Sequence, residues 1–392
     1  MQRFVYADNA GTTALSKTAL DAMMPYLTEF YGNPSSIYSI GRKSKTAIEN
    51  SRLKIATAIG AKTEEIYFTG GGSEADNWAI RSVAEKLSKK GRHIISTVIE
   101  HHAVLHTLRA LEKQGYEVTY LPVNALGQIS LDDLKNAIRD DTILITIIMA
   151  NNEIGTILPI AEISKIAKER GILFHTDAVQ AVGHIPIDVS ELGVDLLSLA
   201  AHKFRGPKGV GALFVKKGIF LPALLTGGGQ EKGRRAGTEN VAGIVGMAAA
   251  LEEAAANMDE NVKKVTAMRD RLIEGLLKIP FSQLTGDPVN RLPGTASFVF
   301  ECIEGESLVL ALDSKGICAS SGSACSSASL DPSHVLLAIG LKHEVAHGSL
   351  RLTINEDNTD EDIDYILAEL PTIIARLRDM SPLWEDKLNG KY

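Results

Sequence analysis

Several residues that could do chemistry stand just beyond apolar stretches that are typical of strands. Asp177 follows the run ILFHT, and His202 and Lys203 follow the run LLSLAA. A carboxylate is costly to bury without a partner, so the position of Asp177 favours a cationic partner. A free lysine amine titrates at about 10.4, so burial or cationic neighbours must lower the pKa of Lys203 if it is to react. The alternative is an ordinary solvated lysine beside a histidine that only makes hydrogen bonds.

A glycine-rich turn, FTGGGSEAD at 68–76, stands between a predicted strand and a predicted helix. Glycines let the backbone approach a ligand, and the first N–H groups of a helix favour an anion. The turn is neither a dinucleotide-binding G-x-G-x-x-G nor a Walker A loop, since no lysine follows the last glycine. The alternative is that Ser73, with Glu74 and Asp76, only caps the helix.

A phosphate site, a carboxylate and a lysine together match the needs of one cofactor. Pyridoxal phosphate needs an anion site, a carboxylate that keeps its pyridine nitrogen protonated, and a lysine amine for a Schiff base. The turn at 68–76, Asp177 and Lys203 can supply these three groups, each at the end of a predicted strand.

Two histidine patterns have alternative interpretations. His102 and His106, which follow His101 in IEHHAVLH, are four residues apart and could form a metal pair on a helix. His343 and His347 match the zinc-protease pattern H-E-x-x-H. Glycines closely bracket the second pattern and a predicted strand follows it, which disfavours the sustained helix that a zinc peptidase needs.

A further residue that could do chemistry is Cys325, in the run SSGSACSSASLDP at residues 320–332. Small residues surround Cys325 and the run closes on an Asp-Pro turn signal, so we expect a polar, mobile loop. Cys302 and Cys318 stand in more apolar surroundings and are predicted to be packing residues. An odd number of cysteines, three in all, argues against a disulfide framework and favours a reducing cytoplasm. A Ser-rich linker with an incidental thiol is the alternative for Cys325.

From about 45 to 215, the predicted elements alternate between strand and helix. This alternation predicts an α/β fold with a mainly parallel sheet. In such a fold, binding and catalytic sites lie at the carboxyl ends of the strands. A Gly- and Arg-rich connection at 225–241 is longer than a passive turn requires, and a long helical stretch at about 240–278 follows it. We predict a large domain at 14–256. We predict a smaller α+β domain at 257–392, together with 1–13, that carries the cysteine loop.

The composition restricts the partners of the chain. Its 392 residues are 45% apolar and 23% charged, with a net charge of −7 and interspersed signs. This balance argues against nucleic acid or an anionic membrane surface as the main partner. The longest apolar run, 142–150, is about half of a membrane span, and the N-terminus turns polar too early for a signal peptide.

Taken together, these stretches resemble the NifS/IscS-type cysteine desulfurases, fold-type I pyridoxal-phosphate enzymes of the class-V aminotransferase family, and details of the C-terminal half are closer to NifS. The matching stretches run in family order from residue 6 to about 352: YADNAGTT, YGNPSS, FTGGGSEADNWAI, IEHHAVL, ANNEIGT, FHTDAVQAVG, AHKFRGPKG, GGGQEKGRRAGTENV and SSGSACSSASLDPSHVL. The resemblance implies a large domain around a mainly parallel sheet, a smaller α+β domain, and removal of sulfur from L-cysteine to give L-alanine.

The resemblance also implies residue roles. For the cofactor, Lys203 would form the Schiff base, Asp177 would pair with the pyridine nitrogen, and His101 would stack on the ring and help to move protons. The other implied cofactor contacts are Gln180 and Asn152 at the phenolic oxygen, and Gly72, Ser73, His202 and Thr238 at the phosphate, with Thr238 coming from the second subunit of a homodimer.

The remaining implied roles concern the substrate. Arg351 would bind the carboxylate of L-cysteine, a task suited to its planar fork, and Asn33 would assist. Cys325 would accept the sulfur as a persulfide, and a sulfur-acceptor or iron–sulfur scaffold protein would take it further. No structural metal site is expected, although Cys325 could serve as a transient iron–sulfur ligand.

Two positions depart from the desulfurase pattern. Ala200 stands where a serine is frequent, so one hydroxyl contact to the phosphate is missing and weaker cofactor retention is expected. Gly11 stands where alanine is usual, a change that we expect to matter little. The alternatives within the fold are a selenocysteine lyase and a cysteine-sulfinate desulfinase. Outside it, they are the zinc peptidase and a non-catalytic anion-binding module.

Overall fold

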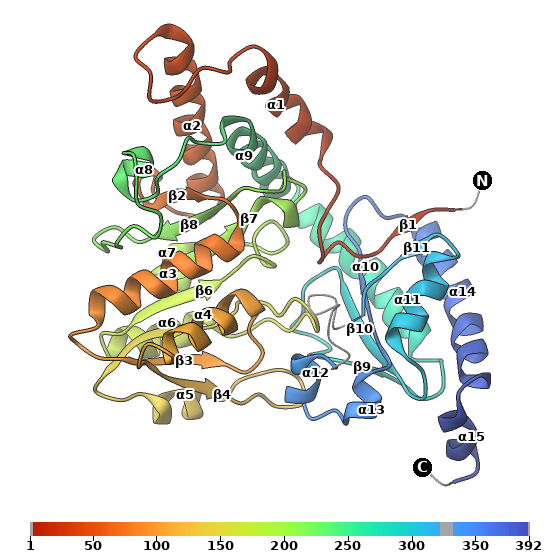
Figure 1. Ribbon diagram of the computed structural model, residues 1–392. Helices are drawn as coiled ribbons and strands as arrows, with labels where there is room; N and C mark the ends of the chain where they lie inside the picture. Colours follow the sequence, from red (N-terminus) through yellow and green to blue (C-terminus); the bar gives the residue numbers. More distant parts are fainter. Residues whose placement is uncertain (1–2, 322–331, 391–392) are drawn as a thin grey trace.

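The molecule is built around a seven-stranded sheet (Figure 1). The structure is a computed structural model that describes residues 3–321 and 332–390. The strand order is β2-β8-β7-β6-β5-β3-β4, and every neighbouring pair is parallel except those that involve β8. The strands are β2 (Ile66–Thr69), β3 (His93–Thr97), β4 (Glu117–Leu121), β5 (Thr142–Thr146), β6 (Leu173–Asp177), β7 (Leu196–Ala200) and β8 (Gly211–Val215). The predicted α/β class with a mainly parallel sheet is confirmed.

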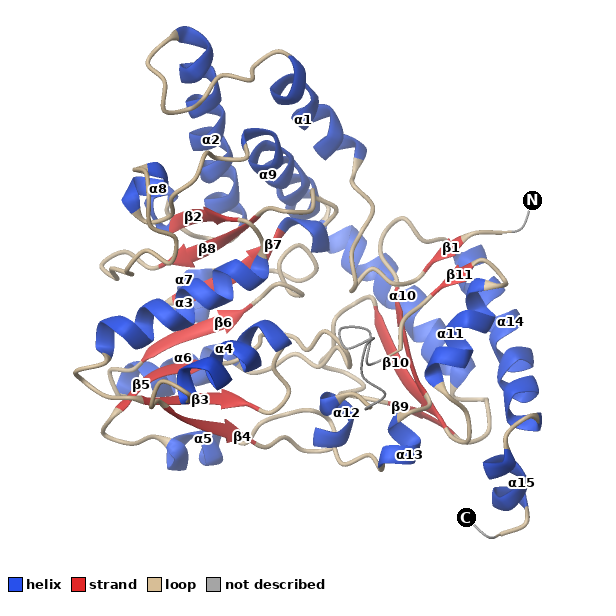
Figure 2. Cartoon of the chain, viewed as in Figure 1, coloured by secondary structure: helices blue, strands red, loops and turns tan. Residues whose placement is uncertain are grey.

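Helices cover both faces of this sheet (Figure 2). Successive strand residues point to opposite faces, so Leu196 packs under α3 and α4 whereas Leu197 belongs to the core that contains α6. Both faces are therefore apolar, as expected for strands that are buried on both sides. The helices of this part are α1 (Lys17–Thr28), α2 (Ser39–Ala58), α3 (Gly72–Leu87), α4 (His102–Glu112), α5 (Leu131–Ala137), α6 (Ile160–Glu169), α7 (Val189–Leu192), α8 (Gln230–Gly233) and α9 (Val241–Ala256), with 3₁₀ turns at Thr63–Glu65 and Ala201–Lys203.

The C-terminal part contains a three-stranded antiparallel sheet, ordered β12-β10-β9, which helices cover on one side. Its elements are α10 (Met258–Leu276), β9 (Ser282–Leu284), β10 (Thr295–Phe300), α11 (Gly305–Asp313), β11 (Ile317–Cys318), α12 (His334–Ala338), α13 (His343–Ala346), β12 (Ser349–Thr353), α14 (Asp360–Asp379) and α15 (Pro382–Leu388). In β12, Leu350 and Leu352 enter the core of this part, so the strand's alternation points Arg351 to the opposite face.

The helical stretch predicted at about 240–278 consists of two helices, α9 and α10, which meet at an angle of 75°. The break falls at Asn257, which ends α9 and precedes α10. It coincides with the predicted domain boundary, although the division into domains stays a prediction. No single helix in the described ranges is long and apolar enough to cross a bilayer, although α9 and α10 reach that length and composition together.

The N-terminal segment connects the two parts of the molecule. Its strand β1 (Val5–Tyr6) pairs with β11, and a bridge joins Asp8 to Thr353 at the end of β12. The chain then passes to the edge of the large sheet before α1 begins (Figure 1). Residues 8–13 therefore lie between the two sheets.

The long Gly- and Arg-rich connection is fixed by a buried ion pair. Glu231, in a left-handed conformation with φ 47°, accepts hydrogen bonds of 2.8 Å from both terminal nitrogens of Arg52. Arg52 also donates to the carbonyl of Ile66 at 2.8 Å, and the side chains of Arg52 and Glu231 are almost fully buried.

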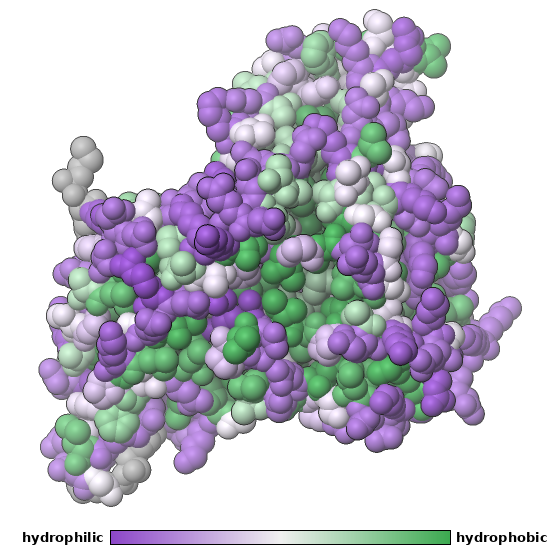
Figure 3. Space-filling model, turned by 180° about the vertical axis from the view of Figure 1, so that it is seen from behind, coloured by the Kyte–Doolittle hydropathy of each residue, from purple (hydrophilic) through white to green (hydrophobic). Residues whose placement is uncertain are grey.

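Elsewhere, large apolar side chains reach the surface of the molecule, as the view from behind shows (Figure 3).

Candidate functional site

A cavity of about 460 Å³ opens at the carboxyl ends of the parallel strands. It brings together nine of the residues singled out from the sequence: Gly72, Ser73, His101, Asn152, Asp177, Gln180, His202, Lys203 and Arg351. Asn33 and Thr238 are exposed and do not line the cavity within one chain. Cys325 lies outside the described residues.

Lys203 closes a 3₁₀ turn that directly follows β7, so its side chain emerges at the edge of the sheet. Its Nζ donates to the carbonyl of Ala10 at 2.5 Å and to the carbonyl of Gly11 at 2.8 Å. Behind it, Nε2 of His184 lies 2.8 Å from the backbone carbonyl of Lys203 and donates to it. The lysine is therefore held by the N-terminal segment.

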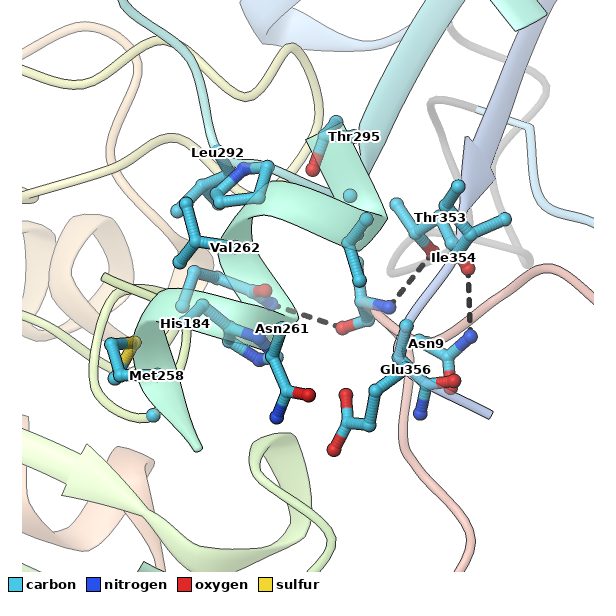
Figure 4. A pocket seen from close by; sticks show the side chains of 17 residues that line it. Asn9, His184, Met258, Asn261, Val262, Leu292, Thr295, Thr353, Ile354 and Glu356 are labelled. Atoms are coloured by element: carbon cyan, nitrogen blue, oxygen red, sulfur yellow. Dashed lines mark hydrogen bonds between the residues drawn. The ribbon is translucent and has the colours of Figure 1, made fainter. Parts of the chain in front are cut away.

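Residues 9 and 10 of that segment are themselves tied down (Figure 4). The side-chain amide of Asn9 donates to the carbonyl of Thr353 at 2.8 Å, and the N–H of Ala10 donates to the hydroxyl of Thr353 at 2.9 Å. Gln180 donates from Nε2 to the carbonyl of Ala10 at 3.0 Å. A second cavity, of about 40 Å³, lies beside these contacts and shares Ala10 and Gln180 with the larger one.

Asp177 ends β6 with its side chain buried at the cavity wall. Its Oδ1 accepts the N–H of Val179 at 2.9 Å. Burial raises the pKa of Asp177 to about 6, against the lowering effects of that hydrogen bond and of Lys203. Burial, and then the charge of Asp177, also raise the pKa of the neighbouring Asp76 well above its usual range. A cationic ring nitrogen beside Asp177 would relieve this cost.

The part of the cavity wall around Gly72 fits an anion. The helix α3 begins at Gly72, after Gly71 with φ 149°, and no side chain of the described residues caps it. A Cβ on Gly72 would stand 2.6 Å from a methyl carbon of Val179, so only glycine leaves this approach open. Nδ1 of His202 lies 3.1 Å from the hydroxyl oxygen of Thr12, and His202 also lines the cavity.

The alternative that Ser73, Glu74 and Asp76 merely cap α3 does not describe the structure. Glu74 accepts the N–H of Gly70 at 2.8 Å and pairs with Arg235 at 2.8 Å. Asp76 is buried, and its Oδ1 has no hydrogen-bond partner among the described residues. The start of a helix, a buried carboxylate and a lysine thus form a set of groups that suits pyridoxal phosphate, and Lys203, Asp177, Gly72, Ser73 and His202 all line the cavity.

His101 is the N-cap of α4, and its Nδ1 accepts the N–H of Ala103 at 3.1 Å. Because Nδ1 accepts, the ring proton of the neutral form must reside on Nε2. Burial lowers the pKa of His101 to about 4, and the nearby charges of Lys203 and His106 act in the same direction. The structure therefore provides a neutral imidazole with one N–H at the wall of the cavity.

Arg351 reaches the cavity from β12 and is 3% exposed. Its Nη1 donates to the carbonyl of Asn152 at 2.8 Å, and its Nη2 donates to Oδ1 of Asp8 at 2.8 Å. Its Nε is buried and has no hydrogen-bond partner among the described residues. A buried guanidinium of this kind is suited to bind a carboxylate.

The chain on both sides of residues 322–331 is anchored beside the cavity. Ser320 forms a β-bridge with Arg351, through hydrogen bonds of 2.7 and 3.1 Å. On the other side, Ser333 donates to Glu153, and the ring of His334 stacks on that of His102 with 5.0 Å between centroids. The chain is thus held before the segment by Arg351, which lines the cavity, and after it by Glu153 and His102, which are next in sequence to the cavity residues Asn152 and His101.

Sequence reasoning missed three acidic groups at the site. Asp8 pairs with Arg351, Asp76 lies beside Asp177, and Glu100 is buried behind His101, where burial raises its pKa to about 8. Asp8 was within a stretch that carried the family resemblance, which is the signal that could have drawn attention to it. Asp76 and Glu100 also stand within such stretches, FTGGGSEADNWAI and IEHHAVL, but nothing in the sequence indicates that their side chains are buried.

The H-E-x-x-H segment forms only the short helix α13 (His343–Ala346), followed by β12. The rings of His343 and His347 are in contact, with centroids 4.7 Å apart. In the part of the chain that the structure describes, no group of three His, Cys, Asp or Glu side chains is arranged to hold a metal ion. His102 and His106 therefore have no third metal ligand among the described residues. The described geometry thus gives no support to a zinc peptidase.

Comparison with known proteins identifies the family of the chain. The family model described as aminotransferase class-V matches residues 5–366, so the chain belongs to that family. Cysteine desulfurase IscS of Methanosarcina thermophila is 59% identical over 379 residues, covering 97% of this chain and 94% of the relative. Cysteine desulfurase IscS of Clostridium botulinum is 56% identical over 394 residues, covering 100% and 99%.

Solved structures show the same fold. A NifS-like protein superposes with a TM-score of 0.91 at 38% identity, covering 96% of this chain and all of that one. SspA in complex with cysteine superposes with a TM-score of 0.80 at 38% identity, covering 89% and 98%. The expected family, its pyridoxal-phosphate dependence and its cysteine desulfurase activity are confirmed.

Proposed function

We propose that this chain removes the sulfur atom from L-cysteine, releases L-alanine and carries the sulfur as a persulfide on Cys325 for transfer to an acceptor. The observation that carries the proposal is the single cavity where Lys203, Asp177, His101 and Arg351 meet. Each of these groups comes from a different element, and each matches one need of amino-acid chemistry on pyridoxal phosphate.

When bound, pyridoxal phosphate would supply an electron sink for the bond changes at the amino acid. Asp177 would hold the ring nitrogen protonated, and Gln180 and Asn152 would lie at the other side of the ring. Gly72, Ser73 and His202 would bind the phosphate. Arg351 would bind the substrate carboxylate and so fix the orientation of its α-carbon.

Proton movement falls to two groups. The Nζ of Lys203 would take the α-proton of the amino acid, because it is the basic nitrogen at the cavity wall. The neutral ring of His101 would stack on the cofactor and offer its Nε2–H, a donor whose position is fixed by the hydrogen bond at Nδ1. His101 fills this role in its neutral form, the form that its burial favours.

Sulfur transfer requires Cys325 as a thiolate. Its sulfur attacks the sulfur of the substrate, a new S–S bond forms, and the C–S bond of the substrate breaks with its electron pair left on carbon. Protonation at that carbon leads to L-alanine. Cys325 is five residues beyond Ser320, and an extended chain spans at most about 3.5 Å per residue, or about 17 Å. Ser320 pairs with Arg351, which lines the cavity. A chain of this length is therefore long enough for Cys325 to reach the cavity.

The chain is further proposed to act as a homodimer in the cytoplasm and to pass its sulfur to an acceptor such as an iron–sulfur scaffold protein. Large apolar side chains of α1 are exposed, including Leu20, Met24 and Leu27, which supports an interface with a second copy. Thr238 would then reach the phosphate of the partner subunit's cavity. Asn33 remains a predicted substrate contact.

The test is the visible spectrum of the holoenzyme before and after addition of L-cysteine, paired with assays for sulfide and L-alanine. Cys325→Ser should keep the cofactor absorbance and lose sulfide release, whereas Lys203→Ala should lose both the lysine-bound absorbance and activity. Full desulfuration by Cys325→Ser would contradict the role of Cys325. A selenocysteine lyase would instead retain its rate on L-selenocysteine in that variant.

A further inference from the structure

Arg351 already holds a carboxylate before any substrate binds. Its Nη2 donates to Oδ1 of Asp8 at 2.8 Å, and Asp8 itself lines the cavity. A guanidinium can take a substrate carboxylate through either of two forks, Nη1 with Nη2 or Nε with Nη2. Both forks include Nη2, the nitrogen that Asp8 occupies.

We propose that Asp8 competes intramolecularly with the substrate carboxylate for Arg351 and thereby sets the affinity of the site for amino acids. This proposal rests on the role of Arg351 given above. An incoming carboxylate must share Nη2 with Asp8 or displace it, and two anions on one guanidinium repel each other. The buried Nε, which has no partner among the described residues, marks where the second carboxylate can bind.

The side chain of Asp8 can respond while its backbone stays fixed. The backbone carbonyl accepts the N–H of Gly11 at 3.0 Å, and a bridge joins Asp8 to Thr353. The carboxylate, in contrast, is 27% exposed. Displacement therefore needs a rotation of the side chain and no refolding of the segment.

Gly11 is what leaves room for this arrangement. A Cβ at position 11 would stand 2.6 Å from Oδ2 of Asp8 and 3.1 Å from its carboxyl carbon. Alanine, which is usual at this position in the desulfurase pattern, would push the carboxylate away from its present position. The substitution expected from the sequence to matter little thus alters the pair that Asp8 forms with Arg351.

The consequence concerns both ends of the reaction. Substrate and product carry the same α-carboxylate, so a resident anion on Arg351 weakens the binding of both and favours release of L-alanine. Asp8 acts in this way as a positioning residue that touches Arg351.

The experiment measures equilibrium binding of L-alanine to the holoenzyme by calorimetry, in the wild type and in Asp8→Asn, Gly11→Ala and Asp132→Asn. L-alanine is the probe because it carries the carboxylate and has no sulfur to transfer. Asp8→Asn should tighten binding by roughly fivefold to tenfold, as expected when a charged competitor at a guanidinium is removed. Gly11→Ala should change affinity in the same direction. Asp132→Asn removes an equal charge from the exposed surface of α5 and should change nothing.

Unchanged or weaker binding of L-alanine by Asp8→Asn, with normal cofactor content, would overturn the proposal. Equal tightening in Asp132→Asn would also overturn it, because net charge would then explain the effect. Arg351→Ala separates this inference from the proposed function. If Arg351→Ala binds L-alanine as well as the wild type, Arg351 does not anchor the carboxylate; if it loses binding while Asp8→Asn is unchanged, only the role of Asp8 fails. The KM for L-cysteine should fall in Asp8→Asn, with kcat changed less.

Discussion

The buried carboxylate of Asp177 should cost the cofactor-free protein stability, and the substitution Asp177→Asn tests this cost. Burial raises the pKa of Asp177 from 3.8 to about 6. Since each tenfold change in proton affinity corresponds to about 1.4 kcal/mol, the charged form is disfavoured by about 3 kcal/mol in the folded apoprotein. Asparagine is uncharged and its side-chain oxygen can still accept the N–H of Val179. The apoprotein with Asp177→Asn should therefore be more stable than the wild type at pH 8.

The pH dependence gives the sign of this effect. A carboxyl group whose pKa is raised on folding stabilises the fold below its unfolded pKa, and this contribution is lost as the pH rises through about 6. The advantage of Asp177→Asn should thus approach about 3 kcal/mol at pH 8 and disappear near pH 4. Relief of the repulsion between Asp177 and Asp76 acts in the same direction.

The assay is urea unfolding of the apoproteins at several pH values, with pyridoxal-phosphate binding measured in parallel. The variant should gain stability as an apoprotein and lose affinity for the cofactor, because its side chain no longer pairs with the ring nitrogen. Equal stabilities at pH 8, or a less stable variant, would refute the reasoning that burial makes this carboxylate costly.

Three further outcomes are expected elsewhere in the chain. Ala200→Ser should slow cofactor loss during dialysis severalfold, because the new hydroxyl would face the glycine turn at the phosphate end of the cavity; equal loss rates would count against that placement. Arg52→Ala should lower the free energy of unfolding by about 3–5 kcal/mol, since it leaves the buried carboxylate of Glu231 without its cationic partner. The control Lys17→Ala, which breaks an exposed ion pair, should lower it by less than about 1 kcal/mol. The ring of His101 should titrate with a midpoint near 4 by NMR; a midpoint near the ordinary value would show that burial does not control its charge.

Much of the site could be predicted because parallel strands bring their carboxyl ends to one edge. Asp177 and Lys203 stand directly after apolar strands, and the sheet order places β6 and β7 side by side. The glycine turn before α3 could be assigned for the same reason. The antiparallel direction of β8 gave no signal, because a buried strand has the same apolar pattern in either direction.

The pair formed by Asp8 and Arg351 could not be predicted, because 343 residues separate its members in the sequence. It depends on the pairing of β1 with β11 and on the bridge at Thr353, both of which are tertiary contacts. The burial of Asp76 could not be predicted either, since an acidic residue in the first turns of a helix normally indicates an exposed cap. The break between α9 and α10 lies at Asn257, where the largely apolar α9 gives way to an α10 that begins with Asp259 and Glu260, so this change of composition was a signal that the sequence did carry.

The most direct test of the central claim is the mass of the peptide that contains Cys325 after the holoenzyme has reacted with one equivalent of L-cysteine and been alkylated. The account predicts that this peptide gains one sulfur atom, that one L-alanine forms per sulfur bound, and that peptides with Cys302 and Cys318 stay unchanged. Release of L-alanine and sulfide with no sulfur on Cys325 would contradict it.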